Sequence, residues 1–412
     1  MVLFPVVQAG GRAYEPAPWT RDRSKVQRRI NRWRLKRWFD RQAEAFALSK
    51  ARVKEDDDAD WECTDMLGRG AFGMVGQWSK YDSRGNVVDT IAIKQADIDT
   101  YREVAADGSP TLPWEALIMR GLAQNGCNNS TELRGLKFYT AESPMKWRYY
   151  LEYYKYGSLH SLVESYKDWN RRHPGRPERI PEAFIWQALH GLALAAYHMW
   201  TVRFDDIVIP GRDPYVLHLD LKHENVLLGD PRPDRTKMQY PTLKVGDWGM
   251  AEYTSRDDPN NSRKYRNYGT IIWMPPEQRD RGRYGSNWRH RVLGTSESPY
   301  SIAHVIWQVG ANIYGLMTMD LYNEQLDKMV DRCERSEHEL RGCGYSPFGP
   351  GGYRSSHYSS KLTKLVEDCL RLDPHLRPSP SELGQRASDG MQPYTDRYLR
   401  TGKLDVLRLN MN

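Results

Sequence analysis

The sequence predicts an α+β fold, in which short strands come first and long helices follow. The pattern of residues 61–95, broken by a glycine-rich segment and by a turn of Ser, Arg, Gly and Asn, indicates three strands. Two long apolar stretches, at 181–200 and at about 302–317, instead indicate buried helices. Strands and helices that are segregated along a chain in this way are typical of the α+β class.

The composition is that of an ordinary globular protein, with 39% apolar and 27% charged residues in a chain of 412. Its five cysteines form no C-x-x-C pair, which argues for a reducing compartment and against a disulfide framework or a zinc site. The N-terminus lacks the features of a signal peptide, and the longest apolar run is too short and too polar to span a membrane. We therefore expect an intracellular location, cytoplasmic or nuclear, and no transmembrane segment.

The positive charge is concentrated at the N-terminus. Residues 1–54 hold 14 Lys/Arg and 4 Asp/Glu, a net charge of +10, so the rest of the chain carries −3 of the total of +7. Residues 1–58 are predicted to form a basic arm, with a helix over 21–54 and an acidic linker after it. Such a helix can bind nucleic acid, an anionic membrane or an acidic protein. In the alternative interpretation, Trp33 and Trp38 pack on the body of the protein while the arginines stay in water.

The polar segment 218–225, with the sequence HLDLKHEN, carries three side chains suited to phosphoryl transfer. Asp220 can accept a proton from a hydroxyl nucleophile, Lys222 can neutralise charge on a phosphate, and Asn225 can offer an oxygen to a divalent cation. Taken alone, the segment is equally compatible with an ordinary polar turn. Its interpretation therefore depends on the motifs on either side of it.

A glycine-rich loop precedes this segment and fits the pattern G-x-G-x-x-G-x-V, from Gly68 through Gly70 and Gly73 to Val75. Glycines let a backbone approach phosphate oxygens closely, because no Cβ holds it away. The same glycine spacing also occurs in the turn of dinucleotide-binding folds, but there a helix follows the loop. Here a strand pattern follows, so we expect a hairpin over the phosphates of a nucleotide.

A lysine and an acid follow the glycine-rich loop at the places where a nucleotide site needs them. Lys94 ends the apolar strand segment Ile-Ala-Ile-Lys, where it can reach nucleotide phosphates if an acid holds it. The helical segment 114–119 supplies Glu115 as that acid. Glu103 is the competitor, but Gly108 and Pro110 would interrupt its helix. An ordinary structural ion pair between Lys94 and Glu115 is the simpler alternative.

Three further segments follow the catalytic one. The strand ending at Gly246 delivers Asp247 in the triplet Asp-Trp-Gly, where a carboxylate can share a magnesium ion with Asn225. After about 20 residues that look mobile, the chain reads GTIIWMPPE, ending at Glu277. Near the C-terminus lies the segment DPHLRP, which contains Arg377.

Together these six motifs resemble the eukaryotic protein kinase family over about residues 61–383, with the serine/threonine branch favoured by Lys222 and Thr270. The resemblance implies a two-lobed fold with a small antiparallel sheet in an N-lobe and a mainly helical C-lobe. It also implies that Arg377 pairs with a buried Glu277. It places the domain at 59–386, the N-lobe at 59–152, the C-lobe at 157–386 and a C-terminal tail at 387–412.

The resemblance also implies ATP and Mg²⁺ as cofactors, a protein substrate with a Ser or Thr hydroxyl, and a role for each motif residue. Asp220 is then the base, Lys222 stabilises charge, Lys94 and Glu115 place the phosphates, and Asn225 and Asp247 hold metal. The nucleotide is expected to contact the following residues: Gly68, Gly70, Gly73, Val75, Ala92, Lys94, Leu151, Glu152, Tyr154 and Leu227.

Three positions depart from the family pattern. Leu219 stands where the family has an arginine that meets an activation-loop phosphate, so we predict activity that does not depend on phosphorylation of that loop, for example at Thr254, Ser255 or Ser262. Trp248 replaces the phenylalanine of D-F-G. Val305 replaces an aspartate that anchors the catalytic loop, which leaves neighbouring His304 as the candidate anchor.

The main alternative function is a pseudokinase, a scaffold or nucleotide sensor whose basic arm tethers it to a partner. The lysine and both aspartates that pseudokinases usually lack are present here as Lys94, Asp220 and Asp247. A kinase of small molecules is less favoured, because the segments containing Glu277 and Arg377 are typical of kinases of protein substrates. Apparent insertions, expected to dock partners or to be surface loops, occur at 201–214, 229–241 and 279–300.

Overall fold

The structure is a computed structural model, and the residues that it describes are 61–70, 73–97, 112–139, 146–204, 207, 209, 211–231, 234, 237–261, 265, 268–279, 300–335, 347–348 and 357–409. The predicted basic arm, Glu103, Ser262 and nearly all of the insertion at 279–300 lie outside these residues. The chain divides into two compact units after Asp97. The two units are described separately below.

The first unit contains an antiparallel meander of three strands, β1 (Trp61–Gly70), β2 (Gly73–Tyr81) and β3 (Val87–Asp97). The tight turn between β2 and β3 forms because the Asp82 carboxylate accepts hydrogen bonds from the backbone N–H groups of Arg84 and Asn86. On one face Trp78 is fully buried with apolar residues of β3. The three predicted strands are therefore present, and β1 continues through the first two glycines of the glycine-rich loop.

The second unit begins with a helix and a hairpin. The helix α2 (Trp114–Gln124) starts after Pro113, with Glu115 in its first turn, where a negative charge complements the helix dipole. Strands β4 (Leu133–Tyr139) and β5 (Lys146–Glu152) pair in antiparallel fashion. Phe138 and Trp147 are cross-strand partners whose ring centroids lie 4.8 Å apart.

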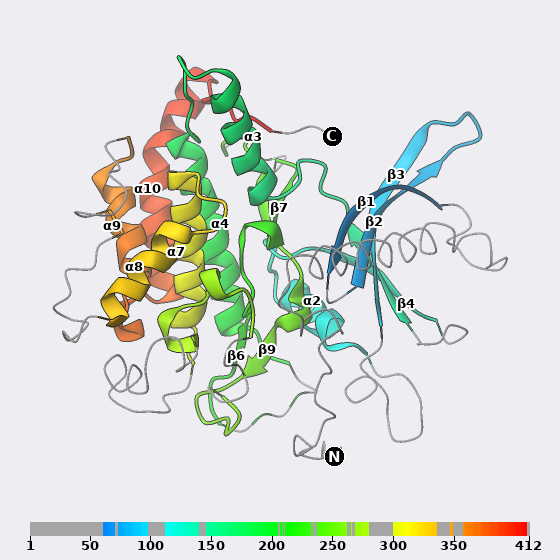
Figure 1. Cartoon of the computed structure of the whole chain (residues 1–412). Coiled ribbons are helices and arrows are strands. Elements are labelled where there is room, and N and C mark those ends of the chain that lie inside the picture. The colour runs from blue at the N-terminus through cyan, green and yellow to red at the C-terminus, as the bar shows by residue number, and fades with distance from the viewer. Residues whose placement is uncertain are drawn as a thin grey trace, which may run out of the picture. The chain divides into compact units, whose positions relative to one another are not determined.

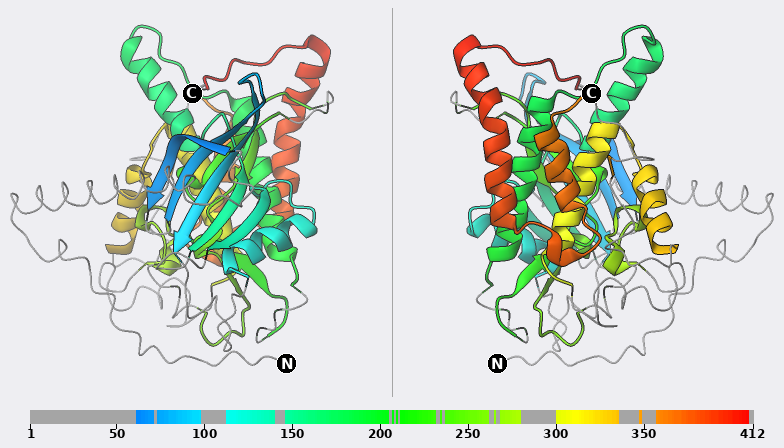
Figure 2. Two further views of the ribbon diagram at one scale, coloured as in Figure 1. Left: turned by 90° about the vertical axis from the view of Figure 1, so that its right-hand side faces the viewer. Right: turned by 90° about the vertical axis from the view of Figure 1, so that its left-hand side faces the viewer.

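Long helices form the core of the second unit, as Figures 1 and 2 show. Helix α4 (Glu182–Thr201) packs against both α7 (Ala303–Thr318) and α10 (Pro380–Thr401). Close approach of α4 and α10 depends on Gly390, because a Cβ there would lie 2.2 Å from the Trp186 ring. Helices α8 (Glu324–Arg335) and α9 (Ser360–Cys369) complete this set. Among the described residues, no helix has the length and apolarity needed to cross a bilayer.

The helix α3 (Leu159–Arg172) is not among the elements that the sequence predicted. It forms because Ser158 and Ser161 make a reciprocal capping box at its start. Pro181 caps α4 rather than lying in its first turn. Helix α10 runs across residue 387, where the tail was expected to begin.

Four short strands in the second unit carry the polar motifs. Strand β6 (Tyr215–Leu217) pairs with β9 (Glu252–Thr254), and β7 (Val226–Gly229) pairs with β8 (Thr242–Val245). The segment 218–225 connects β6 to β7, and Asp247 follows β8. Pairing of β7 with β8 therefore brings the end of the catalytic segment next to the Asp-Trp-Gly triplet.

Candidate active site

The carboxylate of Asp220 is the centre of the site in the second unit. It is only 5% exposed, and its Oδ1 accepts hydrogen bonds from the Thr270 N–H at 2.9 Å and from the Thr270 hydroxyl at 2.7 Å. The Lys222 ammonium lies 3.1 Å from Asp220 Oδ2 and donates to Thr270 Oγ1 at 3.0 Å. The catalytic segment and the segment ending at Glu277 therefore meet in one network of an acid, a cation and a hydroxyl.

Asn225 lies at the end of a short 3₁₀ turn, His223–Asn225, and is tied to the same aspartate. Its amide nitrogen donates to the Asp220 carbonyl at 2.8 Å and to Asp220 Oδ2 at 3.3 Å. The side-chain hydrogen bonds described for Asn225 all use this nitrogen. Because the amide is oriented in this way, its oxygen points away from the Asp220 backbone and can serve as a metal ligand.

Gly246, which precedes Asp247, is bonded on both sides to the catalytic segment. Its N–H donates to the Asn225 carbonyl at 2.8 Å, and its carbonyl accepts from His218 Nε2 at 3.0 Å. Asp247 itself has left-handed backbone angles, φ 56° and ψ 65°, which are uncommon for a residue other than glycine. These contacts place the backbone of Asp247 next to that of Asn225, while a magnesium ion shared by the two side chains stays a prediction.

His218 holds the catalytic segment through both of its ring nitrogens. Nε2 donates to the Gly246 carbonyl, so Nδ1 is the acceptor for the Asp220 N–H at 3.3 Å. Complete burial lowers the pKa of His218, which keeps the ring neutral and preserves this tautomer. The sequence identified His218 only as the first letter of a motif, and nothing in the pattern revealed this bridging role.

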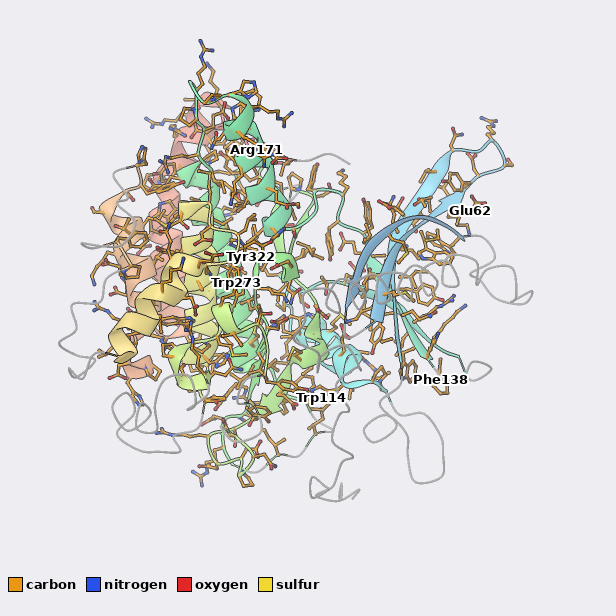
Figure 3. The ribbon with its side chains drawn as sticks, viewed as in Figure 1. Glu62, Trp114, Phe138, Arg171, Trp273 and Tyr322 are labelled. Atoms are coloured by element: carbon orange, nitrogen blue, oxygen red, sulfur yellow. The ribbon has the colours of Figure 1, made fainter. Side chains whose placement is uncertain are left out.

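The expected anchor for the catalytic segment was wrong. Both ring nitrogens of His304 lack a hydrogen-bond partner among the described residues, and burial lowers the pKa of this histidine to about 4. The anchor is Asn312, two turns further along α7, whose amide nitrogen donates to the Leu221 carbonyl at 3.1 Å. The Asn312 carbonyl also bonds the ring of His223 at 2.8 Å, and this ring packs against Trp273, which is labelled in Figure 3.

The connector between β5 and α3, residues 153–158, lies against β7, the strand that carries Leu227. The Gly157 carbonyl accepts from the Leu228 N–H at 2.8 Å, and Ser158 forms an isolated bridge with Leu227. Tyr154 is buried, and its hydroxyl donates to the Glu152 carboxylate at 3.1 Å. The structure thus brings Glu152, Tyr154 and Leu227 into one part of the second unit, with Leu151 at the end of β5.

The first unit holds the other predicted nucleotide contacts, namely Gly68, Gly70, Gly73, Val75, Ala92 and Lys94. Gly73 needs to be glycine, because its φ is +118° and a Cβ would lie 2.0 Å from the Gln95 carbonyl oxygen. Lys94 is 6% exposed and pairs in register with Val75, while Glu115 belongs to the second unit. The pairing of Lys94 with Glu115 therefore stays a prediction.

Helix α2 is connected to the Asp-Trp-Gly triplet by contacts that the sequence did not reveal. The indole N–H of Trp114, labelled in Figure 3 at the start of α2, donates to the Ala251 carbonyl at 2.8 Å. Trp248 is fully buried, with its ring centroid 4.7 Å from that of His218, and the turn Trp248–Met250 packs against α2. The helix that carries Glu115 is thus fixed to the segment that carries Asp247.

Gly269 lies directly against the backbone of the catalytic segment. Its φ is +122°, and a Cβ would lie 2.2 Å from the Leu219 carbonyl oxygen. We expect Gly269→Ala to displace Thr270 and to lower phosphoryl-transfer kcat by roughly ten- to hundredfold, because small misplacements of reacting groups are costly. Steady-state kinetics would measure this.

Gly384→Ala is the matched control for Gly269→Ala. A Cβ at Gly384, inside α10, meets nothing within 4 Å, so the substitution should leave kcat unchanged and slightly favour the helix. Equal kinetics for Gly269→Ala and Gly384→Ala would show that the close approach at Leu219 has no role in activity.

The comparisons with known proteins agree with this geometry. The family model described as "Protein kinase domain" matches residues 61–387, which is most of the chain. The chain belongs to the protein kinase family. Its kinase domain therefore has the two-lobed α+β architecture that the sequence predicted.

Individual relatives are distant. The human protein "Mitogen-activated protein kinase kinase kinase 19" is 24% identical over 370 residues, covering 87% of this chain and 22% of the relative. From Emericella nidulans, "Cytokinesis protein sepH" is 24% identical over 364 residues, covering 86% and 21%, and "G2-specific protein kinase nimA" is 24% identical over 250 residues, covering 57% and 29%. The chain thus spans between about a fifth and a third of the length of these relatives.

Proposed function

We propose that this chain transfers the γ-phosphoryl group of Mg-ATP to a serine or threonine hydroxyl of a protein substrate. The observation that carries the proposal is the network in which Asp220 bonds Thr270 and Lys222 reaches both of them. A buried carboxylate beside a cation, held by an oriented backbone, is the arrangement that activation of a hydroxyl nucleophile needs.

In the proposed mechanism, Asp220 orients the substrate hydroxyl and takes its proton. The hydroxyl oxygen forms the new bond to the γ-phosphorus, and the bond from that phosphorus to the oxygen bridging to the β-phosphate breaks, so that ADP leaves. Lys222, 3.1 Å from the Asp220 carboxylate, is placed to neutralise the charge that develops on the transferred group. Because this transition state is loose, positioning and electrostatics supply most of the rate enhancement.

The chemistry of Asn225 and Asp247 fits magnesium. One amide oxygen and one carboxylate, together with phosphate oxygens of a nucleotide, are the kind of ligands that Mg²⁺ takes at kinase sites. When bound, the ion would neutralise charge on the β- and γ-phosphates. The orientation of Asn225 by the Asp220 carbonyl supports this assignment, because it commits the amide nitrogen and leaves the amide oxygen for a cation.

The connector supports a place for the adenine ring in the second unit. The Glu152 N–H already donates to the Glu132 carbonyl at 3.1 Å, so we assign the base contact at this residue to its carbonyl oxygen. Leu227, half-buried on β7 next to the connector, would form one face of the pocket. Val75, Ala92 and Lys94 of the first unit are proposed to complete the nucleotide site.

The choice of serine or threonine over tyrosine is tested by phosphoamino acid analysis. The full chain would be incubated with Mg²⁺ and γ-labelled ATP and a mixed protein substrate, and the labelled residues identified after hydrolysis. We expect phosphoserine and phosphothreonine, because Lys222 and Thr270, the residues typical of the serine/threonine branch, both bond within the Asp220 network. Label found mainly on tyrosine would contradict the proposal.

A further inference from the structure

The activation segment, defined here as residues 247–277, is held by two buried side-chain amides. The first is Asn261, which is 5% exposed. Its amide nitrogen donates to the Ser255 carbonyl at 2.8 Å and to the Tyr300 carbonyl at 3.0 Å, and its oxygen accepts from the Tyr300 N–H at 2.8 Å. One asparagine thus joins the early part of the segment to the residues that lead into α7.

The second amide belongs to Gln278, which is fully buried and directly follows Glu277. Its nitrogen donates to the Tyr265 carbonyl at 3.1 Å and to the Tyr268 carbonyl at 2.6 Å. Tyr268 immediately precedes Gly269, the residue that makes the close approach to the Leu219 carbonyl. Gln278 therefore fixes the backbone just before the point where the segment meets the catalytic loop.

The two amides act on the same network from opposite ends. The Tyr215 hydroxyl donates to the Tyr300 carbonyl at 2.5 Å. Tyr215 is the first residue of β6, where it pairs with Thr254 of β9, and β6 leads directly to His218 and Asp220. On the other side, Thr270 bonds Asp220 directly. The amide of Asn261 therefore stabilises the pairing of β6 with β9. The amide of Gln278 holds the backbone just before Thr270, which keeps Thr270 within hydrogen-bond distance of Asp220.

The contacts of Asn261 and Gln278 join neutral groups only, and the Thr254 and Ser255 hydroxyls near the start of the segment are inaccessible. The segment was expected to look mobile here, but Thr254 lies in β9 and both Thr254 and Ser255 are 0% exposed. The Thr254 hydroxyl already donates to Asp258 at 2.7 Å. A phosphate on either residue would require β9 to open, and the apolar, fully buried Leu219 offers it no charge.

We propose that Asn261 and Gln278 are positioning residues that hold the activation segment in its working arrangement without a phosphate group. This inference rests on the kinase activity proposed above. The hydrogen bonds of the two amides take the place of an ion pair between a phosphate and a cation. Each amide donates two hydrogen bonds to backbone carbonyls, and removal of either side chain would break both of its bonds.

The test compares Asn261→Ala, Gln278→Ala and their double variant with wild type, all as the full chain. Each is assayed before and after treatment with a broad-specificity protein phosphatase. We expect phosphatase-treated wild type to keep its kcat within about twofold. The single variants should lose about tenfold in kcat, and the Kd for Mg-ATP should stay within about twofold, because the amides hold the segment and not the nucleotide.

Gln187→Ala is the matched control. Gln187 on α4 also donates two hydrogen bonds to backbone carbonyls, those of Tyr240 and Pro241, both at 3.1 Å, and neither residue belongs to the activation segment. The kcat of the Gln187→Ala variant should equal that of wild type. A general loss of stability would lower kcat and weaken Mg-ATP binding together, in the control as in the amide variants.

Two results would overturn the inference: loss of wild-type activity on phosphatase treatment, or unchanged kcat in the double variant. If wild type transfers no phosphate at all, the proposed function fails, and hydrogen exchange then tests the amides separately. The Thr270 N–H, bonded to Asp220, should exchange at least about tenfold faster in the double variant than in wild type or Gln187→Ala. Equal exchange in all three proteins would refute the positioning role.

Discussion

Replacing Asp220 with asparagine is expected to lower kcat by about 10²–10⁴-fold, with the affinity for Mg-ATP changed by less than about threefold. Asparagine has nearly the shape of aspartate, and its oxygen can still accept the hydrogen bonds of Thr270. It has no basicity, however, so it cannot take the proton of the substrate hydroxyl. Steady-state phosphorylation kinetics and a direct nucleotide-binding measurement would separate the two effects.

Asp389→Asn serves as the control for the Asp220 variant. Asp389 is an exposed carboxylate on α10 that bonds Gln385, so its loss should change neither kcat nor nucleotide affinity. If Asp220→Asn kept the wild-type turnover, Asp220 would not be the base. If it lost nucleotide binding as well as turnover, the defect would lie in folding or in the nucleotide site, and the mechanism would have to be revised.

Arg377→Ala is expected to destabilise the second unit by about 3–5 kcal/mol, which is typical when one partner of a buried ion pair is removed. The guanidinium bonds Glu277 through two nitrogens, at 2.6 Å and 2.8 Å, and both side chains are almost completely buried. It also donates to the carbonyls of Ala303 and Arg371. Its loss therefore removes the hydrogen bonds that join the segments containing Glu277, Ala303 and Arg371. The pairing of Glu277 with Arg377 that the sequence predicted is confirmed.

The effect is large because Arg377→Ala would leave the Glu277 carboxylate buried without the guanidinium that neutralises its charge. Burial acts to raise the pKa of Glu277, but the charge and hydrogen bonds of Arg377 outweigh it and hold the pKa below its ordinary value. Because the folded-state pKa is the lower one, the ion pair stabilises the fold above the ordinary pKa, and this stability is lost as the pH falls through the folded value. Without Arg377, the buried carboxylate has no such compensation at neutral pH.

Guanidinium denaturation would measure the loss, with Lys328→Ala as the control. Lys328 and Glu324 form an exposed pair on α8 at 3.4 Å, which should contribute less than about 1 kcal/mol. The double replacement of Glu277 and Arg377 by Leu and Met should recover part of the stability, because it leaves no buried charge. A change below about 1 kcal/mol for Arg377→Ala would contradict the structural role assigned to the pair.

Sequence reasoning located the motif residues because each motif combines a chemical group with a local conformation. The apolar strands β7 and β8 are readable as strands, so the positions of Asn225 and Asp247 at their ends could be predicted. The Glu277–Arg377 pair could be predicted because the two segments that contain these residues resemble known motifs of the protein kinase family. In both cases the information lies within a few residues of the side chain concerned.

Contacts between distant segments left no comparable pattern. Asn312 is one polar residue in an apolar helix, and nothing local distinguishes it from His304 as the partner of the catalytic loop. The bond from Trp114 to Ala251 and the two amide contacts of Gln278 likewise depend on the folded chain. Helix α3 was missed because its start depends on a serine pair, Ser158 and Ser161, that resembles a flexible connector in composition.

The account as a whole rests on the claim that Asp247 and Asp220 belong to one magnesium-dependent site. Phosphorylation of a peptide library by the full chain, wild type against Asp247→Ala, tests it most directly. We expect wild type to phosphorylate a subset of Ser/Thr peptides only when Mg²⁺ is present, and Asp247→Ala to lose at least about 10²-fold of that activity. Equal labelling by the two proteins, or labelling that does not need the metal, would contradict the account.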